Sequence, residues 1–141
     1  MLSKKQAKTF FLGGTLVTFL IFIGLTIYSF SKSNDQTNYE DLSESAIRGK
    51  VIWESNNCMG CHTLLGEGAY YAPELTKVVD RLNKRYNGEG EEVIKSILMS
   101  PSPWQPNGRK MVAYNMSEQE AQDMVAFFKW IGNIDLNGFG E

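Results

Sequence analysis

Hydrophobic and polar positions divide the chain into one long apolar run and a longer segment with helical periodicity. From Phe10 to Phe30 the sequence reads FFLGGTLVTFLIFIGLTIYSF, with no charged residue between Lys8 and Lys32. A helix of about 20 apolar residues spans the hydrocarbon core of a bilayer, which is roughly 30 Å thick. We therefore expect residues 10–30 to form a transmembrane anchor helix that follows a short N-terminus, residues 1–9.

A cleaved signal peptide is the alternative for this run. Such peptides usually have an apolar region of about 7–15 residues that ends at a cleavage site of small residues. Here the run is longer and continues into SFSKSNDQ, so we favour an uncleaved anchor. Lys4, Lys5 and Lys8 precede the run, and by the positive-inside rule they place the N-terminus in the cytoplasm and the rest of the chain outside it.

The remaining sequence predicts a tether and a small all-α domain. Residues 31–43, SKSNDQTNYEDLS, are polar without apolar periodicity and are expected to form the tether, so that the domain covers residues 44–141. Apolar spacing and stop signals predict no strand and four helices: from Ser43 or Ser45 to Asn57, from Glu74 to Tyr86, from Glu91 to Met99, and from Ser117 onward. Ser117 and Glu120 have the spacing of a capping box at the start of the last helix.

The charge of the domain excludes one class of partner. Because the three lysines before the apolar run lie on the cytoplasmic side, the rest of the chain has eleven basic against 16 acidic residues, a net charge of about −5. A domain of this charge is not expected to bind nucleic acid, and it is compatible with a basic protein partner.

Both cysteines and the only histidine of the chain lie within five positions, in the segment Cys58-Met59-Gly60-Cys61-His62. This is the C-x-x-C-H pattern of c-type haem attachment. Two thiols at this spacing on one turn can form thioethers to both vinyl groups of one porphyrin, and the next residue presents its imidazole to the iron. We therefore predict one covalently bound haem c, with His62 as an axial ligand.

Three other interpretations of the motif account for fewer of its features. A structural zinc site needs four ligands, and the chain has no Cys or His beyond these three. A thioredoxin-like redox pair is expected in a βαβ context, which the sequence does not predict. A disulfide between Cys58 and Cys61 would leave His62 unexplained. The haem interpretation also agrees with the predicted topology, because haem c is attached on the outer side of the cytoplasmic membrane, where the domain is expected.

The second axial ligand is expected to be a methionine, since no second histidine exists in the chain. Methionine raises the reduction potential of haem iron, as suits an electron carrier. Met99 and Met124 have helical spacing and are expected in the core. Met111, in the loop before the last helix, is the favoured ligand. Met116 next to the helix cap and an open sixth site are the alternatives.

These features resemble class I cytochromes c. In that family a proline in a P-x-L segment after the motif offers its carbonyl to the ligating imidazole, and Pro73-Glu74-Leu75 matches this segment. The resemblance implies that Pro73 orients His62; a helix start at Pro73 is compatible with the same role. It also implies that the first and last helices cross, through Gly49 and Trp53 on one and the aromatic residues Phe127, Phe128 and Trp130 on the other.

A more specific resemblance extends over nearly the whole chain. The segments WESNNCMGCH, HTLLGEGAYYAPEL and MVAYNMSEQEAQDMVAFFKWIGNIDLNGF closely resemble the cytochrome c subunit of bacterial cytochrome c-dependent nitric oxide reductase. The resemblance implies a heterodimer with a catalytic subunit that holds two b-type haems and a non-haem iron and reduces NO to N2O. The chain itself would be a non-catalytic electron-transfer subunit in the inner membrane, with a periplasmic domain that accepts electrons from a soluble cytochrome c or cupredoxin.

The resemblance also implies a calcium ion at the subunit interface. Gly68 would offer its carbonyl and Tyr70 would take part nearby, and oxygen ligands suit that ion. Judged from the residues alone, GEGAYY is a tight loop with two aromatic residues, and Glu67 is more simply a solvated carboxylate than a ligand.

Other functions remain alternatives on the sequence alone. They are an anchored monohaem cytochrome c that shuttles electrons without an obligate partner, a subunit of a haem–copper oxidase, and a haem-based gas sensor. A shuttle usually needs a longer tether than residues 31–43. A sensor needs an open sixth site and an output domain.

Overall fold

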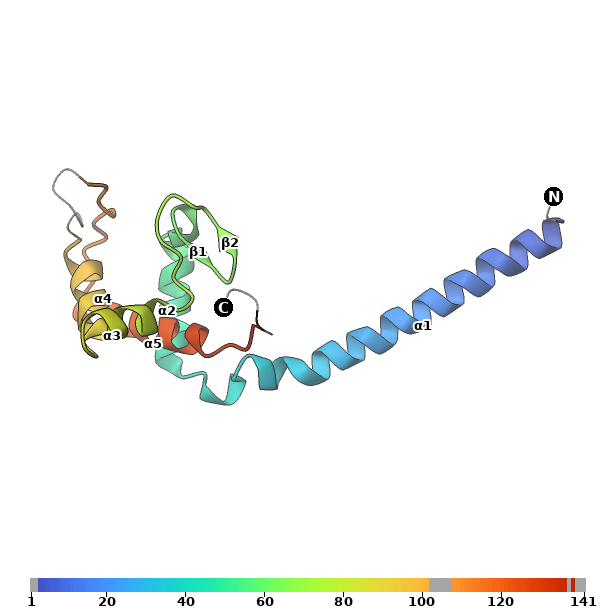
Figure 1. Ribbon diagram of the computed structural model, residues 1–141, viewed down its shortest axis with the longest axis horizontal. Coiled ribbons are helices and arrows are strands. Elements are labelled where there is room, and N and C mark those ends of the chain that lie inside the picture. Colours follow the sequence, from blue (N-terminus) through green and yellow to red (C-terminus); the bar gives the residue numbers. More distant parts are fainter. Residues whose placement is uncertain (1–2, 102–107, 137, 139–141) are drawn as a thin grey trace. The chain divides into compact units, whose positions relative to one another are not determined.

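The computed structural model describes residues 3–101, 108–136 and 138. The chain divides into two compact units, Met1–Gln36 and Thr37–Glu141. Figure 1 shows the single long helix of the first unit and the group of shorter helices of the second.

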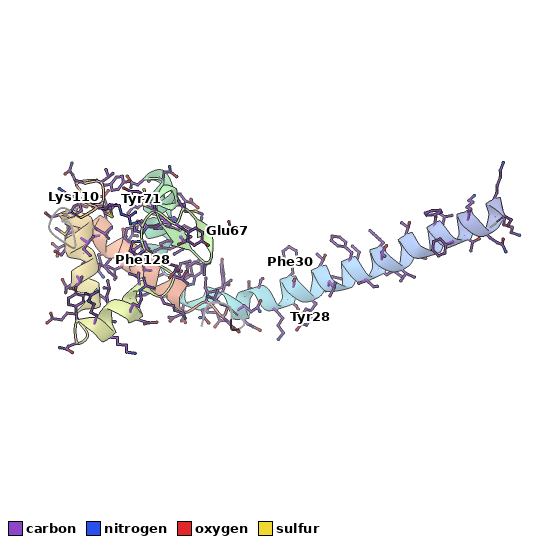
Figure 2. The ribbon with its side chains drawn as sticks, turned by 45° about the horizontal axis from the view of Figure 1, so that its top comes forward. Tyr28, Phe30, Glu67, Tyr71, Lys110 and Phe128 are labelled. Atoms are coloured by element: carbon purple, nitrogen blue, oxygen red, sulfur yellow. The ribbon has the colours of Figure 1, made fainter. Side chains whose placement is uncertain are left out.

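The first unit is the helix α1, Lys4–Gln36. It is long and apolar enough to cross a membrane, and an 18-residue window within it has a mean hydropathy of 2.3. Its apolar side chains are exposed along the whole length, and Figure 2 shows Tyr28 and Phe30 projecting from it. The hydroxyl groups of Thr18 and Thr26 donate to carbonyls of the preceding turn, at 3.0 Å from Gly14 O and 2.8 Å from Phe22 O. This removes the unpaired polar groups that a lipid environment penalises.

The end of α1 differs from the sequence prediction. The helix continues to Gln36, so residues 31–36 of the predicted tether are helical. Two residues later, Asn38 already belongs to the second unit: its backbone carbonyl accepts a hydrogen bond from Trp130 Nε1 at 3.2 Å, and its side-chain amide donates to Asn133 O at 2.5 Å. The 3-10 turn Tyr39–Asp41 follows.

The helices α2, Glu44–Ser55, and α5, Glu118–Gly132, form the centre of the second unit. Each begins at a serine cap. Ser43, one of the two predicted starts of α2, accepts from Ala46 N through its Oγ at 3.1 Å, and Ser117 and Glu120 form the predicted capping box of α5. The two helices cross where α2 has Gly49, and they appear as the crossing teal and red ribbons of Figure 1.

The packing at this crossing confirms the contact predicted between the glycine and aromatic residues of the two helices, with Trp130 as the exception. A Cβ atom at Gly49 would lie 2.1 Å from Asp123 O, so only glycine allows this approach. The Trp53 ring lies 6.2 Å from the ring of Phe127 and 5.8 Å from that of Phe128. Trp130, also predicted here, instead donates its ring N–H to Asn38 O.

The helices α3, Val78–Arg85, and α4, Gly90–Met99, pack beside α5. The predicted start of α3 at Glu74 was wrong by four residues, because the backbone of residues 73–76 makes other contacts, described below. Met124 is 1% exposed, as expected of a core residue. Met99 is 43% exposed, contrary to expectation, since it is the last residue of α4.

A short hairpin that the sequence did not predict lies beside these helices. Its strands are β1, Thr63–Leu64, and β2, Glu67–Gly68, paired antiparallel with Thr63 opposite Gly68. The two turn residues have positive φ, 52° at Leu65 and 83° at Gly66. This is the backbone conformation of a type I′ hairpin turn, in which glycine is common and leucine is rare.

Candidate haem site

The two cysteines lie on one tight turn at the end of α2. Asn57 adopts the left-handed conformation, with φ 50°, and starts the 3-10 turn Cys58–Gly60. The carbonyl of Cys58 accepts hydrogen bonds from the backbone N–H of Cys61 at 3.2 Å and of His62 at 2.9 Å. Both cysteines are free thiols, Cys58 half-buried and Cys61 exposed. The turn therefore presents two thiols and the imidazole from one short segment.

The imidazole of His62 is held by a backbone carbonyl. His62 Nδ1 lies 2.7 Å from Pro73 O. Because a carbonyl can only accept, Nδ1 carries the proton, and in the neutral imidazole Nε2 then has its lone pair free for a metal. The contact implied by the resemblance to class I cytochromes c is therefore present. Its role in orienting an iron ligand stays a prediction.

The loop between the hairpin and Pro73 is fastened to the attachment turn by backbone hydrogen bonds. Ala69 N donates to Met59 O at 2.9 Å, and Ala72 N donates to Cys61 O at 2.8 Å. Leu75 N donates to Thr63 O at 3.0 Å. The Leu75 bond uses backbone that the sequence prediction had assigned to the first turn of α3, and the bonds from Ala72 and Leu75 flank Pro73, whose carbonyl contacts His62.

Met111 lies in the segment that leads to α5, half-buried and packed against the core. Met116 is 7% exposed and belongs to the core cluster, as expected for a residue beside the Ser117 cap. Two hydrogen bonds on either side of Met111 reach the attachment turn and its loop: Arg109 Nη1 donates to Tyr71 O at 2.8 Å, and the Tyr114 hydroxyl donates to Asn56 O at 3.3 Å. Met111 as the axial ligand stays a prediction.

The electrostatics of the thiols differ from those of a redox site. Burial, with a smaller contribution from Cys61, raises the pKa of the Cys58 thiol. Reactive cysteines of thiol–disulfide enzymes have lowered pKa values instead. In the part of the chain that the structure describes, no three His, Cys, Asp or Glu side chains gather into a metal site. The raised pKa of Cys58 counts against the redox interpretation.

The residues present fit a c-type haem. The donor set consists of two free thiols on one turn and an imidazole whose Nε2 is available. Apolar side chains of the neighbouring segments pack on the core and are only partly buried, among them Ile52, Leu65, Leu75 and Met111. A flat apolar ring that covered them would bury this surface.

Comparisons with known proteins agree with this geometry. The Cytochrome c family model matches residues 46–132. The chain is 42% identical to the C subunit of nitric oxide reductase from Stutzerimonas stutzeri, over 96% of this chain and 91% of that protein. It is 38% identical to the protein of the same name from Halomonas halodenitrificans, over 95% and 91% of the two chains. The corresponding protein of Paracoccus denitrificans is 35% identical over 99% and 94%.

The chain belongs to the family of nitric oxide reductase C subunits. Its domain is a cytochrome c domain, and the all-α fold predicted from the sequence is confirmed. A cytochrome c domain implies haem c as its cofactor.

The local backbone geometry of this chain is sufficient to require glycine at position 68. Its φ is 118°, and a Cβ atom there would lie 2.3 Å from His62 O. Tyr70 is 84% exposed, and Glu67 is exposed as well. Figure 2 labels Glu67 on this hairpin. A glycine at position 68 is therefore required whether or not a calcium ion binds there.

Sequence reasoning did not identify Arg109, Tyr114 or Asn56 as site residues. The hydrogen bonds of these residues join segments that are far apart in the chain. Because none of the residues belongs to a local motif, the sequence alone did not indicate these bonds.

Proposed function

We propose that this chain is the electron-input subunit of a nitric oxide reductase. It would hold one haem c, bound covalently through Cys58 and Cys61 and ligated by His62 and Met111. The observation that carries the proposal is the attachment turn: two free thiols and a histidine whose Nδ1 lies 2.7 Å from Pro73 O, in a chain similar to C subunits of nitric oxide reductases over nearly its whole length.

The residues of the chain have separate roles in this proposal. Haem c, when bound, supplies a one-electron Fe(III)/Fe(II) couple. Cys58 and Cys61 would fix the ring to the end of α2. Pro73 O holds the Nδ1 proton of His62 and directs Nε2 outward. Met111 would raise the reduction potential, which allows electrons to be accepted singly from a soluble periplasmic cytochrome c or cupredoxin.

NO reduction itself would take place in the partner. The chain has one histidine, which the haem c already uses, so it cannot ligate b-type haems or a histidine-rich iron site. The catalytic subunit would hold two b-type haems and the non-haem iron, where two NO molecules, two electrons and two protons give N2O and water. The present chain would deliver those electrons to the low-spin haem b.

The membrane arrangement follows from α1 and the three lysines before it. We propose that α1 is a single span of the inner membrane, with the N-terminus in the cytoplasm and the haem domain in the periplasm. The connection after it is short: α1 continues to Gln36, and Asn38 is hydrogen-bonded to the end of α5. A short connection suits a subunit that stays docked better than a shuttle that moves between partners.

Calcium at the subunit interface is part of the proposal through the family resemblance. The Gly68 carbonyl and Tyr70 would take part, with further oxygen ligands from the haem propionates and the partner. The exposure of Tyr70 supports a role in contacts outside this chain.

The test is to isolate the full chain from native membranes in mild detergent, then record a reduced-minus-oxidised spectrum and NO consumption on the same sample. We expect haem b to co-purify and NO to be consumed with a soluble electron donor. An intact preparation that contains haem c alone would favour the anchored shuttle. Oxygen consumption in place of NO consumption would favour the oxidase subunit.

A further inference from the structure

We infer that Arg109 is a positioning residue that holds Met111 against the haem face by fastening its segment to the loop that orients His62. The inference rests on the proposed axial ligation by His62 and Met111. The role of Arg109 is indirect, without contact to the iron ligands. It acts through the backbone on either side of the haem.

The contact has two components. Arg109 Nη1 donates a hydrogen bond to Tyr71 O at 2.8 Å, and the guanidinium carbon lies 4.7 Å from the centre of the Tyr71 ring. A planar guanidinium can form both interactions at once, whereas a lysine ammonium cannot reproduce the stacking geometry. In Figure 2, Tyr71 and Lys110, the neighbour of Arg109, are labelled close together.

Each of the two segments that Arg109 joins leads within two residues to a group proposed to act on the iron. Tyr71 lies two residues before Pro73, whose carbonyl holds His62, and Arg109 lies two residues before Met111. The Tyr71 loop is itself fastened to the attachment turn, because Ala72 N donates to Cys61 O at 2.8 Å. A short path of hydrogen bonds therefore leads from the turn that carries the haem to the segment that carries Met111.

A second hydrogen bond fixes the Met111 segment on the C-terminal side of Met111. The Tyr114 hydroxyl donates to Asn56 O at 3.3 Å, so Met111 lies between two anchors at positions 109 and 114. The Tyr114 bond is long and neutral, whereas the Arg109 bond is charge-assisted and stronger. We therefore assign the larger share of the positioning to Arg109.

The effect can be measured through an external ligand that must displace Met111. Imidazole binds the ferric iron only when the Met111 segment opens, so its apparent affinity rises in proportion to the open fraction. Loss of an exposed charge-assisted hydrogen bond and a cation–π contact should raise that fraction about fivefold to tenfold. A role in stability alone would leave the imidazole affinity unchanged.

The experiment uses the full-length haem-loaded chain in detergent. Arg109→Gln is compared with Arg109→Lys and with Arg85→Gln, a matched control because Arg85 lies 5.7 Å from the centre of the Tyr86 ring, at the end of α3. We expect Arg109→Gln to bind imidazole about fivefold to tenfold more tightly than the unmodified chain and to weaken the methionine-to-iron charge-transfer band. Arg109→Lys should fall between the two, and Arg85→Gln should match the unmodified chain.

Equal imidazole affinity in Arg109→Gln and Arg85→Gln would overturn the inference. Met111→Leu separates this result from a failure of the proposed function. If Met111→Leu abolishes the charge-transfer band while Arg109→Gln has no effect, the positioning role alone is wrong. If the band survives in Met111→Leu, the axial assignment is wrong and the inference falls with it.

Discussion

The crossing of α2 and α5 and the loops around His62 meet at Trp53, but different interactions hold them together. At the crossing, side chains pack closely: Trp53 contacts Phe127 and Phe128, and the backbones of the two helices approach at Gly49. Around His62, apart from the short buried strand β1, the segments are turns and loops that are mostly exposed or half-buried, and backbone hydrogen bonds fix them to one another.

From this difference we expect some substitutions to change the free energy of unfolding and others to change the ligation of the haem. The crossing is complete within the polypeptide, so substitutions there should change the free energy of unfolding. The loops leave apolar surface partly uncovered and direct a thiol pair and an imidazole outward, so substitutions there should change ligation first. The following variants test this separation, in order of decreasing expected effect on stability.

The largest effect is expected from Gly49→Ala. Alanine in a helix normally stabilises relative to glycine, but here its Cβ would lie 2.1 Å from the backbone oxygen of Asp123 and 2.7 Å from Phe127 Cβ. Because a backbone atom cannot move aside alone, we expect a loss of about 3 kcal/mol in the free energy of unfolding, measured by denaturant titration.

Gly132→Ala is the matched control for this variant. It makes the same substitution at the last residue of α5, where the added Cβ would lie 3.3 Å from Thr76 O. We expect a change below about 1 kcal/mol. A loss for Gly49→Ala as small as that expected for Gly132→Ala would show that the helices at Gly49 separate without cost, contrary to the packing described.

The next effect concerns Asp123, whose carboxylate joins the two helices. It accepts hydrogen bonds from Arg48 Nε at 2.8 Å, Ser45 Oγ at 2.5 Å and Gln119 Nε2 at 3.1 Å. The Arg48 hydrogen bond is the main cause that lowers the pKa of Asp123 from 3.8 to about 2. A lowered pKa contributes stability that is present above the unfolded-state pKa, near 4, and is lost as the pH falls through about 2.

The variant Asp123→Asn should therefore lose about 2 kcal/mol at neutral pH and show a smaller decrease in stability between about pH 4 and pH 2. Urea titrations at several pH values measure both quantities. Asp80→Asn makes the same chemical change at an exposed position of α3 and should keep the acid dependence of the unmodified chain. An unchanged acid dependence in Asp123→Asn would contradict the assignment.

The elements at the crossing were the ones that the sequence could predict. Serine caps and apolar spacing are local signals: they predicted the start of α5 at Ser117 and limited the start of α2 to Ser43 or Ser45, of which Ser43 is the cap. The crossing of the two helices was predicted from glycine and aromatic residues at helical spacing together with the family resemblance. Met99 was misplaced because apolar spacing does not show that α4 ends there.

The elements around His62 depended on contacts between distant residues. Leu65 adopts a positive φ that its sequence does not favour, and its N–H donates to Thr76 Oγ1 at 2.7 Å, eleven residues away. The backbone of residues 73–76 faces the attachment turn instead of starting a helix. Arg109 was not identified because no local motif includes its partner. The attachment motif, by contrast, is defined by local spacing alone, so the sequence is enough to identify it.

A smaller loss of stability, with an effect on the haem, is expected from Gly68→Ala. Position 68 has φ 118°, and the new Cβ would lie 2.3 Å from His62 O. We expect a loss of about 1–2 kcal/mol from backbone strain, together with a shifted reduction potential because the backbone of His62 must move. Denaturant titration and a redox titration, both with a calcium chelator present, measure the two effects.

Gly88→Ala is the matched control for the strain. It has φ 98° and no atom within 4 Å of the added Cβ, so it should lose similar stability without any change in the potential. If the potential of Gly68→Ala shifts only when calcium is present, the close approach to His62 is not the cause, and the ion is.

The smallest effect on the isolated chain is expected from Tyr70→Ala. Tyr70 is 84% exposed, so its loss should change the free energy of unfolding by less than about 0.5 kcal/mol. The same variant should weaken binding to the catalytic subunit, because an exposed aromatic side chain beside the haem motif contributes more to an interface than to its own domain. Tyr39→Ala, at a residue that is 60% exposed outside this loop, is the control, and it should keep the partner in a detergent pull-down. Equal retention of the partner by both variants would show that Tyr70 lies outside the interface, and the family-based assignment of Tyr70 would then be wrong.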